Sequence, residues 1–306
     1  MQEPNLQHLT VNGSAANTGA PRRMAYWDWP CANGDTGQVV VCVHGLSRQG
    51  RDFDTLARTL GERARVIAVD VTGRGHSDWL ADPMGYQVPT YAADLVALLM
   101  HLRTQDPGVT IDWVGTSMGG LIGMAIAAQP ALAPRRLVLN DVGPSIQWEA
   151  LQRISTYLGQ NPSFDSEQAA LDYLASISTG FGPHTPAQWR GLSLPLLRER
   201  DGRWWLHYDP AIAMPVKALT GMADEAQARQ VARDGEAMLW QLYDAITAPT
   251  LLLRGGQSDL LSEATAIEMG QRGPRARCVV FDGVGHAPTL VADDQVAAVR
   301  DFLWSD

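Results

Sequence analysis

Residues 111–121 read IDWVGTSMGGL and predict a strand, a sharp turn and a helix in direct succession. The first four residues are an apolar run of strand type, and small apolar residues follow Leu121. Between them stands the pattern Gly-x-Ser-x-Gly, with Ser117 at its centre. A serine on such a turn needs glycine two positions to either side, because a Cβ atom there would block the turn. The stretch therefore predicts a nucleophilic serine raised above the edge of a sheet.

Other apolar runs extend this pattern in both directions along the chain. Six near-continuous runs alternate with helical patterns, which is typical of a mostly parallel sheet with helices on both faces. These runs are residues 39–43, 66–71, 111–114, 136–140, 250–253 and 278–281. Two shorter runs, residues 9–11 and 23–27, predict an antiparallel pair ahead of them. Helical spacing predicts helices over residues 91–102, 121–128 and 293–304. The sequence thus predicts the α/β class, with an eight-stranded, mostly parallel sheet.

The alternation stops between residues 143 and 246, where helical stretches are punctuated by Pro and Gly and no run looks like a strand. We interpret residues 143–246 as a helical cap (lid) inserted into a core domain formed by residues 1–142 and 247–306. The insertion holds five of the ten tryptophans, namely Trp148, Trp189, Trp204, Trp205 and Trp240. We expect some of its aromatic side chains to line a cavity under the cap and the others to pack it against the sheet.

Composition excludes several classes of function. The 306 residues have a formal net charge of -9, and their 24 basic side chains form no basic stripe, which argues against nucleic-acid binding. No apolar run reaches the roughly 18 residues of a membrane helix, and Met1–Thr10 lacks the pattern of a signal peptide, so we expect a cytoplasmic protein. The three cysteines argue against a disulfide scaffold or a zinc site, and we expect Cys42 and Cys278 to be buried. No metal and no cofactor are expected, and the expected partner is a small-molecule substrate.

A serine hydroxyl needs a base, and histidine supplies one near neutral pH. His286 lies just after the last predicted strand, at the same carboxyl edge of the sheet as Ser117. We therefore assign the base to His286. The other six histidines are expected to be structural; they are His8, His44, His76, His101, His184 and His207.

The third member of such a set is a carboxylate that orients the imidazole ring. Asp259 follows the predicted strand 250–253 and gives the chain order Ser, Asp, His, so we favour Asp259. Asp141 also stands at the carboxyl end of a predicted strand and is the alternative. If Asp259 is the orienting carboxylate, we expect Asp141 to anchor a loop or the cap.

Acyl transfer also needs donors aimed at the oxyanion. Two backbone N–H groups are suitable: that of Met118, next to the serine, and that of Leu46, in the loop after strand 39–43. Gly45 precedes Leu46 and would let the backbone approach the site closely.

With these motifs the sequence resembles the α/β-hydrolase fold superfamily. The resemblance covers nearly the whole chain, from Leu9 to Trp304. The shared features are His44-Gly45, Asp70 with Gly73-Arg74-Gly75-His76-Ser77, the turn at Ser117, Asp259 and Gly285-His286. The resemblance implies that the Gly-Arg-Gly loop is structural, so Arg74 and His76 are not assigned to catalysis. Haloalkane dehalogenases and epoxide hydrolases of this fold carry Asp where Ser117 stands, and neither activity is therefore expected.

The expected activity is hydrolysis of carboxylic esters with an apolar, short to medium acyl chain through an acyl-enzyme. An alternative is carbon–carbon bond hydrolysis of the meta-cleavage-product type, which ranks second because Leu46-Ser47 and Ala287 replace a longer Gly-rich loop and an aromatic residue. A lactonase or a thioesterase could use the same triad, whereas a ligand receptor of this fold is disfavoured because the triad is complete. Nucleotide binding is discounted because Asp78 stands where a Gly-x-Gly-x-x-Gly loop needs glycine.

Overall fold

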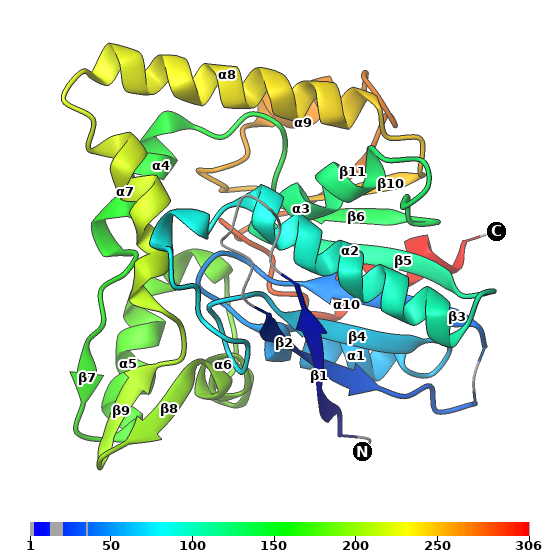
Figure 1. The fold of residues 1–306 in the computed structure, drawn as a ribbon, viewed down its shortest axis with the longest axis horizontal. Helices are drawn as coiled ribbons and strands as arrows, with labels where there is room; N and C mark the ends of the chain where they lie inside the picture. The colour runs from blue at the N-terminus through cyan, green and yellow to red at the C-terminus, as the bar shows by residue number, and fades with distance from the viewer. Residues whose placement is uncertain (1–2, 13–20, 35, 306) are drawn as a thin grey trace.

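A computed structural model describes residues 3–12, 21–34 and 36–305 of the chain (Figure 1). Its centre is an eight-stranded sheet in the order β1-β2-β4-β3-β5-β6-β10-β11. The strands are β1 (Asn5–Val11), β2 (Arg22–Trp29), β3 (Gln38–Val43), β4 (Arg65–Asp70), β5 (Thr110–Thr116), β6 (Leu137–Asn140), β10 (Thr250–Gly255) and β11 (Arg277–Phe281). Strand β2 pairs antiparallel with β1 and β4, and the remaining pairs are parallel. The predicted sheet is confirmed. The parts of our predictions that concern residues 1, 2, 13–20, 35 and 306 lie outside the described residues.

Helices cover the sheet on both faces. On one face α2 (Val88–Gln105), α3 (Met118–Ala127) and α9 (Glu263–Met269) contribute to the larger of two hydrophobic clusters. On the other face α1 (Asp54–Leu60) and α10 (Asp293–Trp304) contribute to the smaller cluster. The predicted apolar stripe of α2 is buried at Leu95, Leu98, Leu99 and Leu102. None of the helices in the described residues combines the length and the apolar character needed to cross a membrane.

The outermost strand differs from its prediction. We expected residues 278–281 to be covered on both faces, but Cys278 is exposed and Val280 is 50% exposed. Strand β11 pairs only with β10 in the sheet order, and its solvent-facing side is left uncovered. The burial predicted for Cys278 is therefore wrong, whereas Cys42, in the central strand β3, is buried as predicted.

The segment that connects β6 to β10 contains more than helices. Residues 143–246, which we call the inserted segment, hold helices α4 (Trp148–Tyr157), α5 (Glu167–Ile177), α6 (Pro186–Ser193), α7 (Met214–Thr220) and α8 (Glu225–Asp244). They also hold a three-stranded antiparallel sheet of β7 (Ser163–Phe164), β9 (Arg203–Leu206) and β8 (Leu197–Arg200). The prediction of a purely helical insertion was therefore wrong. Strand β7 has only two residues, and β8 and β9 have four residues each and carry three arginines between them, so none contains an apolar run as long as those of the central strands β3 and β4.

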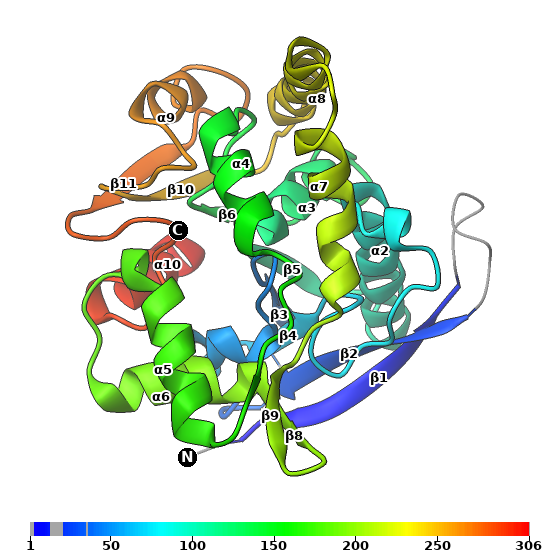
Figure 2. The ribbon, with the colours of Figure 1, turned by 90° about the vertical axis from the view of Figure 1, so that its left-hand side faces the viewer.

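Figure 2 shows α4, α5 and α7 of the inserted segment in front of the carboxyl ends of the central strands, while α8 runs along one side of the molecule (Figure 1). The inserted segment therefore lies over the sheet edge at which Ser117 lies.

Short 3-10 helices complete the described chain: η1 (Gly50–Phe53), η2 (Pro83–Gly85), η3 (Thr179–Phe181), η4 (Leu194–Leu196) and η5 (Pro210–Ala213).

Candidate active site

Ser117 occupies a strained turn between β5 and α3. Its φ angle is 51°, in the left-handed region, and its N–H donates to the carbonyl of Asn140 at 2.9 Å. A Cβ atom on Gly119 would lie 2.0 Å from the carbonyl oxygen of Val43, and one on Gly115 would lie 2.3 Å from that of Gly119. Both contacts are far inside van der Waals distance, so the two glycines are sterically required, as the sequence pattern predicts.

His286 reaches Ser117 from the loop after β11. Its Nε2 atom lies 3.0 Å from Ser117 Oγ, within hydrogen-bond distance. The side chain is 17% exposed, so it stands at the boundary between the protein interior and the pocket. The structure therefore brings together the two residues that the sequence singled out as nucleophile and base.

Asp141, and not Asp259, accepts a hydrogen bond from the other nitrogen of this imidazole. Asp141 Oδ2 lies 2.7 Å from His286 Nδ1, and its side chain is fully buried. The same carboxylate accepts from the Gly255 N–H at 2.8 Å and from Ser258 Oγ at 2.6 Å. These three donors fix its orientation, which keeps the proton of the neutral imidazole on Nδ1 and leaves Nε2 free to accept from the serine.

The assignment of Asp259 as the orienting carboxylate was wrong. Asp259 is 52% exposed and forms an ion pair with Arg153 of α4 at 2.7 Å. It stands four residues beyond the end of β10, and the loop presents Ser258 to Asp141 and turns Asp259 outward to the pocket. Asp141, by contrast, follows β6 directly and has a positive φ of 55°. The sequence signal for Asp141 was its place at a strand end, which made it the alternative.

The predicted oxyanion loop lies beside the serine. A Cβ atom at Gly45 would lie 3.6 Å from the Cβ of Ser117, which shows how closely the loop approaches. Leu46 is held there through its carbonyl, which accepts from Arg74 Nε at 2.8 Å. Arg74 Nη2 also contacts the Met118 sulfur at 3.6 Å, and the arginine is fully buried. Arg74 therefore links Leu46 and Met118, the two residues predicted to supply the oxyanion donors. The sequence did not reveal this link, and the role of the two N–H groups as donors stays a prediction.

His44 illustrates why the neighbouring histidines are unsuited to act as the base. It is fully buried, with Nδ1 2.6 Å from the Gly45 carbonyl and Nε2 accepting from the Val71 N–H at 3.0 Å. Burial lowers its pKa to about 3, and burial also lowers the pKa of His207 to about 4. Both imidazoles are neutral at physiological pH, and His44 has both ring nitrogens committed to the backbone.

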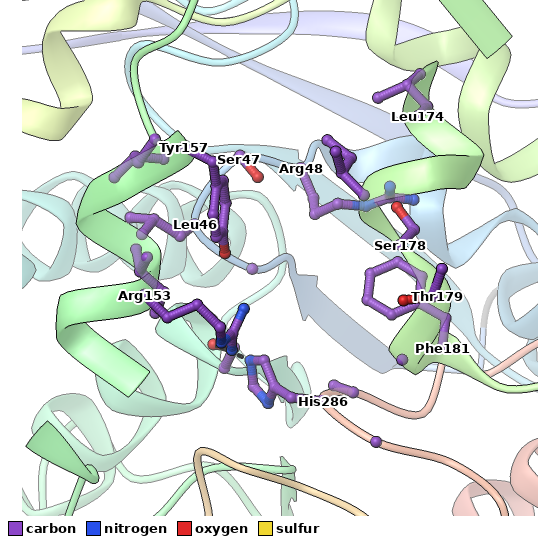
Figure 3. Close-up of a pocket in the computed structure, with 18 of the residues that line it drawn as sticks. Leu46, Ser47, Arg48, Arg153, Tyr157, Leu174, Ser178, Thr179, Phe181 and His286 are labelled. Atoms are coloured by element: carbon purple, nitrogen blue, oxygen red, sulfur yellow. Dashed lines mark hydrogen bonds between the residues drawn. The ribbon is translucent and has the colours of Figure 1, made fainter. Parts of the chain in front are cut away.

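A pocket of about 470 Å³ opens in front of Ser117 and His286 (Figure 3). Its apolar lining comes mainly from the inserted segment: Ile154, Tyr157, Leu158, Tyr173, Leu174, Ile177, Phe181, Leu196, Leu206 and Tyr208. Its charged lining consists of Arg48, Arg153 and Asp259. The expectation that aromatic residues of the insertion reach a cavity is met by Tyr157, Tyr173, Phe181 and Tyr208. The five tryptophans of the insertion, all in the described chain, are absent from the lining.

The loop of His286 is also tied to the inserted segment. The Gly285 N–H donates to the Gly180 carbonyl at 2.6 Å, and His184 Nε2 lies 2.7 Å from Thr289 Oγ1. The inserted segment therefore contacts the site from two directions: α4 borders the pocket beside Asp259, and residues 180–184 support the histidine loop.

Comparison with known proteins identifies the family of the chain. A family model described as the alpha/beta hydrolase family matches residues 40–299. A 3-hydroxybutyrate-oligomer hydrolase of Cupriavidus necator is 46% identical over 287 residues, which cover 92% of each chain. The esterase Rv0045c of Mycobacterium tuberculosis is 30% identical over 283 residues, covering 88% of this chain and 83% of the relative. A crystal structure of an alpha/beta hydrolase from Novosphingobium aromaticivorans superimposes with a TM-score of 0.80 at 34% identity, covering 99% of both chains.

Proposed function

Because the chain belongs to the alpha/beta hydrolase family and is therefore a hydrolase, we propose that it cleaves carboxylic esters with Ser117 as nucleophile, His286 as general base and Asp141 as the orienting carboxylate. One observation carries this proposal: the continuous row of hydrogen bonds from Ser117 Oγ to His286 Nε2, at 3.0 Å, and from His286 Nδ1 to Asp141 Oδ2, at 2.7 Å. Such a row is the arrangement by which a serine hydroxyl loses its proton as it attacks.

The proposed reaction has two halves. In the first, Ser117 Oγ attacks the acyl carbon while His286 takes the serine proton, and the imidazolium then returns this proton to the departing alcohol. In the second, His286 removes a proton from water, the resulting hydroxide attacks the acyl-enzyme, and the acid leaves as Ser117 regains its proton. The backbone N–H groups of Leu46 and Met118 would stabilise the oxyanion in both halves.

We propose short oligoesters of hydroxy acids as the substrate class. The relative from Cupriavidus necator is named for 3-hydroxybutyrate oligomers and matches nearly the whole chain at 46% identity. The pocket volume of about 470 Å³ lies within the range of pockets that hold small ligands. Its apolar lining suits the short, apolar acyl chain predicted from the sequence, and its charged lining suits a polar end of the same molecule.

We further propose that residues 143–246 act as a cap, with residues 1–142 and 247–306 as the core. This segment supplies most of the apolar lining of the pocket and contacts the histidine loop through Gly180. An acyl chain held between the cap and the sheet would be shielded from water while the acyl-enzyme forms.

The test of the proposed function is the Ser117→Ala variant, assayed on p-nitrophenyl butyrate and on the dimer of 3-hydroxybutyrate. We expect kcat to fall by about 10³-fold or more, because the nucleophile is lost while the fold is retained. Circular dichroism of both proteins controls for folding. Hydrolysis at the wild-type rate by a folded Ser117→Ala protein would contradict the proposal.

A further inference from the structure

The two arginines of the pocket differ in what their guanidinium groups already bind. Arg48 donates to both oxygens of Asp52 at 2.7 Å and to the Leu192 carbonyl at 3.0 Å, and its side chain is 13% exposed. Its Nε and Nη2 donors are therefore occupied by contacts that tie the oxyanion loop to the inserted segment. Arg48 is a structural link whose position these contacts fix.

Arg153 is held much more loosely. It projects from α4, is 46% exposed, and pairs with Asp259, which is 52% exposed. It also contacts Tyr157, with its guanidinium carbon 6.0 Å from the centre of the ring and a side-chain hydrogen bond to the phenol. An ion pair between two exposed side chains contributes little to stability, because water and salt screen it. Exchanging the Asp259 carboxylate for that of a ligand would therefore cost the protein little.

This ion pair stands next to the reacting groups. Arg153, Asp259, Ser117 and His286 line the same pocket, and Figure 3 shows Arg153 reaching from α4 towards the side where His286 lies. Asp259 directly follows Ser258, whose hydroxyl donates to the Asp141 carboxylate. A guanidinium that can change partners is thus positioned beside the machinery proposed for ester cleavage.

We propose that Arg153 is a specificity-determining residue: it binds the free carboxylate of an acidic ester substrate in exchange for Asp259. This inference rests on the proposed function and names the feature of the substrate that the pocket selects. In a dimer of a hydroxy acid, the ester bond joins an uncharged acyl half to an alcohol half that ends in a free carboxylate. A guanidinium group can hold such a carboxylate with two parallel hydrogen bonds.

Asp259 then has a definite part in the exchange. In the free protein it pairs with Arg153. When an anionic substrate arrives, the two carboxylates compete for one guanidinium group, so Asp259 weakens binding of acids relative to neutral esters. The same carboxylate would repel the substrate anion wherever Arg153 is absent.

The experiment compares one ester bond with and without the neighbouring charge. Its substrates are the 3-hydroxybutyrate dimer and the primary amide of that dimer, which is uncharged and has no second ester bond. Its readout is the ratio of kcat/KM for the acid to kcat/KM for the amide. In Arg153→Gln we expect this ratio to fall about tenfold or more, chiefly through a higher KM for the acid, since one charge-assisted pair is lost. The ratio for Arg153→Lys should lie between those of the wild type and Arg153→Gln, because lysine keeps the charge but lacks the planar guanidinium fork.

A matched control and an opposite variant sharpen the test. Arg190→Gln removes a similarly exposed arginine of the inserted segment and should leave the ratio unchanged. Arg190 pairs with Glu167 and does not line this pocket. Asp259→Asn should raise the ratio, because Arg153 loses its competing carboxylate. An unchanged ratio in both Arg153→Gln and Asp259→Asn would overturn the proposal; if Arg153→Gln does not fold, Arg153→Lys and Asp259→Asn decide it.

A binding measurement separates this proposal from the proposed function. In the Ser117→Ala background, calorimetry of 3-hydroxybutyrate binding should show a weaker affinity when Arg153→Gln is added, whatever bond the protein cleaves. Equal affinity of the Ser117→Ala protein and of the Ser117→Ala, Arg153→Gln double variant would count against carboxylate recognition by Arg153. Persistent ester hydrolysis by Ser117→Ala would instead count against the proposed function and leave the binding result standing.

Discussion

At the scale of single residues, the buried imidazole of His44 makes the stability of the protein depend on pH. The Val71 N–H donates to Nε2, so protonation of this nitrogen would break the bond and bury a charge. The folded-state pKa of about 3 lies below the ordinary histidine pKa of 6.5, so the unfolded chain binds more protons between these two pH values. The stabilisation is complete above pH 6.5 and is lost as the pH falls towards 3.

We therefore expect the wild-type protein to lose about 2 kcal/mol more free energy of unfolding between pH 7 and pH 5 than His44→Gln does. Urea denaturation at the two pH values measures this difference. Asp70, whose pKa burial raises to about 6, gains a proton in the folded state over the same range and acts in the opposite direction. It is present in both proteins, so the comparison isolates His44. Equal losses in the two proteins would show that His44 does not titrate as described.

Single residues also show how far the sequence could identify the site. Ser117 and His286 were predicted because a local pattern and a strand-end position identify them. The choice between Asp141 and Asp259 was not local: both follow strands at the same sheet edge, and what separates them is the course of the loop after β10, which presents Ser258 to Asp141 and Asp259 to Arg153. Side-chain pairing of this kind depends on tertiary packing that strand patterns do not contain.

At the scale of elements, the junction of β5 and α3 tolerates no added side chain. In Gly119→Ala the new Cβ atom would meet the Val43 carbonyl at 2.0 Å. We expect a loss of about 1–3 kcal/mol or more in the free energy of unfolding, and a loss of ester hydrolysis because the turn that holds Ser117 must shift. Urea denaturation and the p-nitrophenyl butyrate assay measure the two effects.

Gly235, inside α8, provides the matched control. A Cβ atom there would have no heavy atom within 4 Å outside its own helix, so Gly235→Ala should stabilise the protein by about 0.5–1 kcal/mol and leave hydrolysis unaffected. Similar stability changes in the two variants would mean that the junction is less tightly packed than the structure shows.

Elements were predictable where burial gives them a clear pattern. Strands β3 and β4 are buried on both faces, and α2 is buried along one stripe, so each follows from the spacing of its apolar residues. Strands β8 and β9 were missed because they form a small, partly exposed ribbon whose residues include Arg198, Arg200 and Arg203. The position of strand β11 was predicted correctly, but its exposure to solvent was not. An apolar run does not reveal that its strand stands at the edge of the sheet.

At the scale of the whole molecule, strand order brings the site together. Strand β6 lies between β5 and β10, and β11 lies beyond β10, so the carboxyl ends of four adjacent strands meet at one edge. Ser117 follows β5, Asp141 follows β6, Ser258 follows β10 and His286 follows β11. The sequence predicted the sheet and its class, but the pairing order arises from long-range contacts, and it is this order that makes Asp141 the neighbour of the serine strand.

The assay that decides the assignment is hydrolysis of p-nitrophenyl butyrate by Asp141→Asn and Asp259→Asn, with urea denaturation as the folding control. Asn at position 141 would offer His286 an amide donor as well as an acceptor, so it would no longer fix the proton on Nδ1. We expect Asp141→Asn to lower kcat by about 10³- to 10⁴-fold, and Asp259→Asn to stay within about tenfold of the wild type. A folded Asp141→Asn protein that retains wild-type turnover, beside an Asp259→Asn protein that loses it, would contradict the assignment.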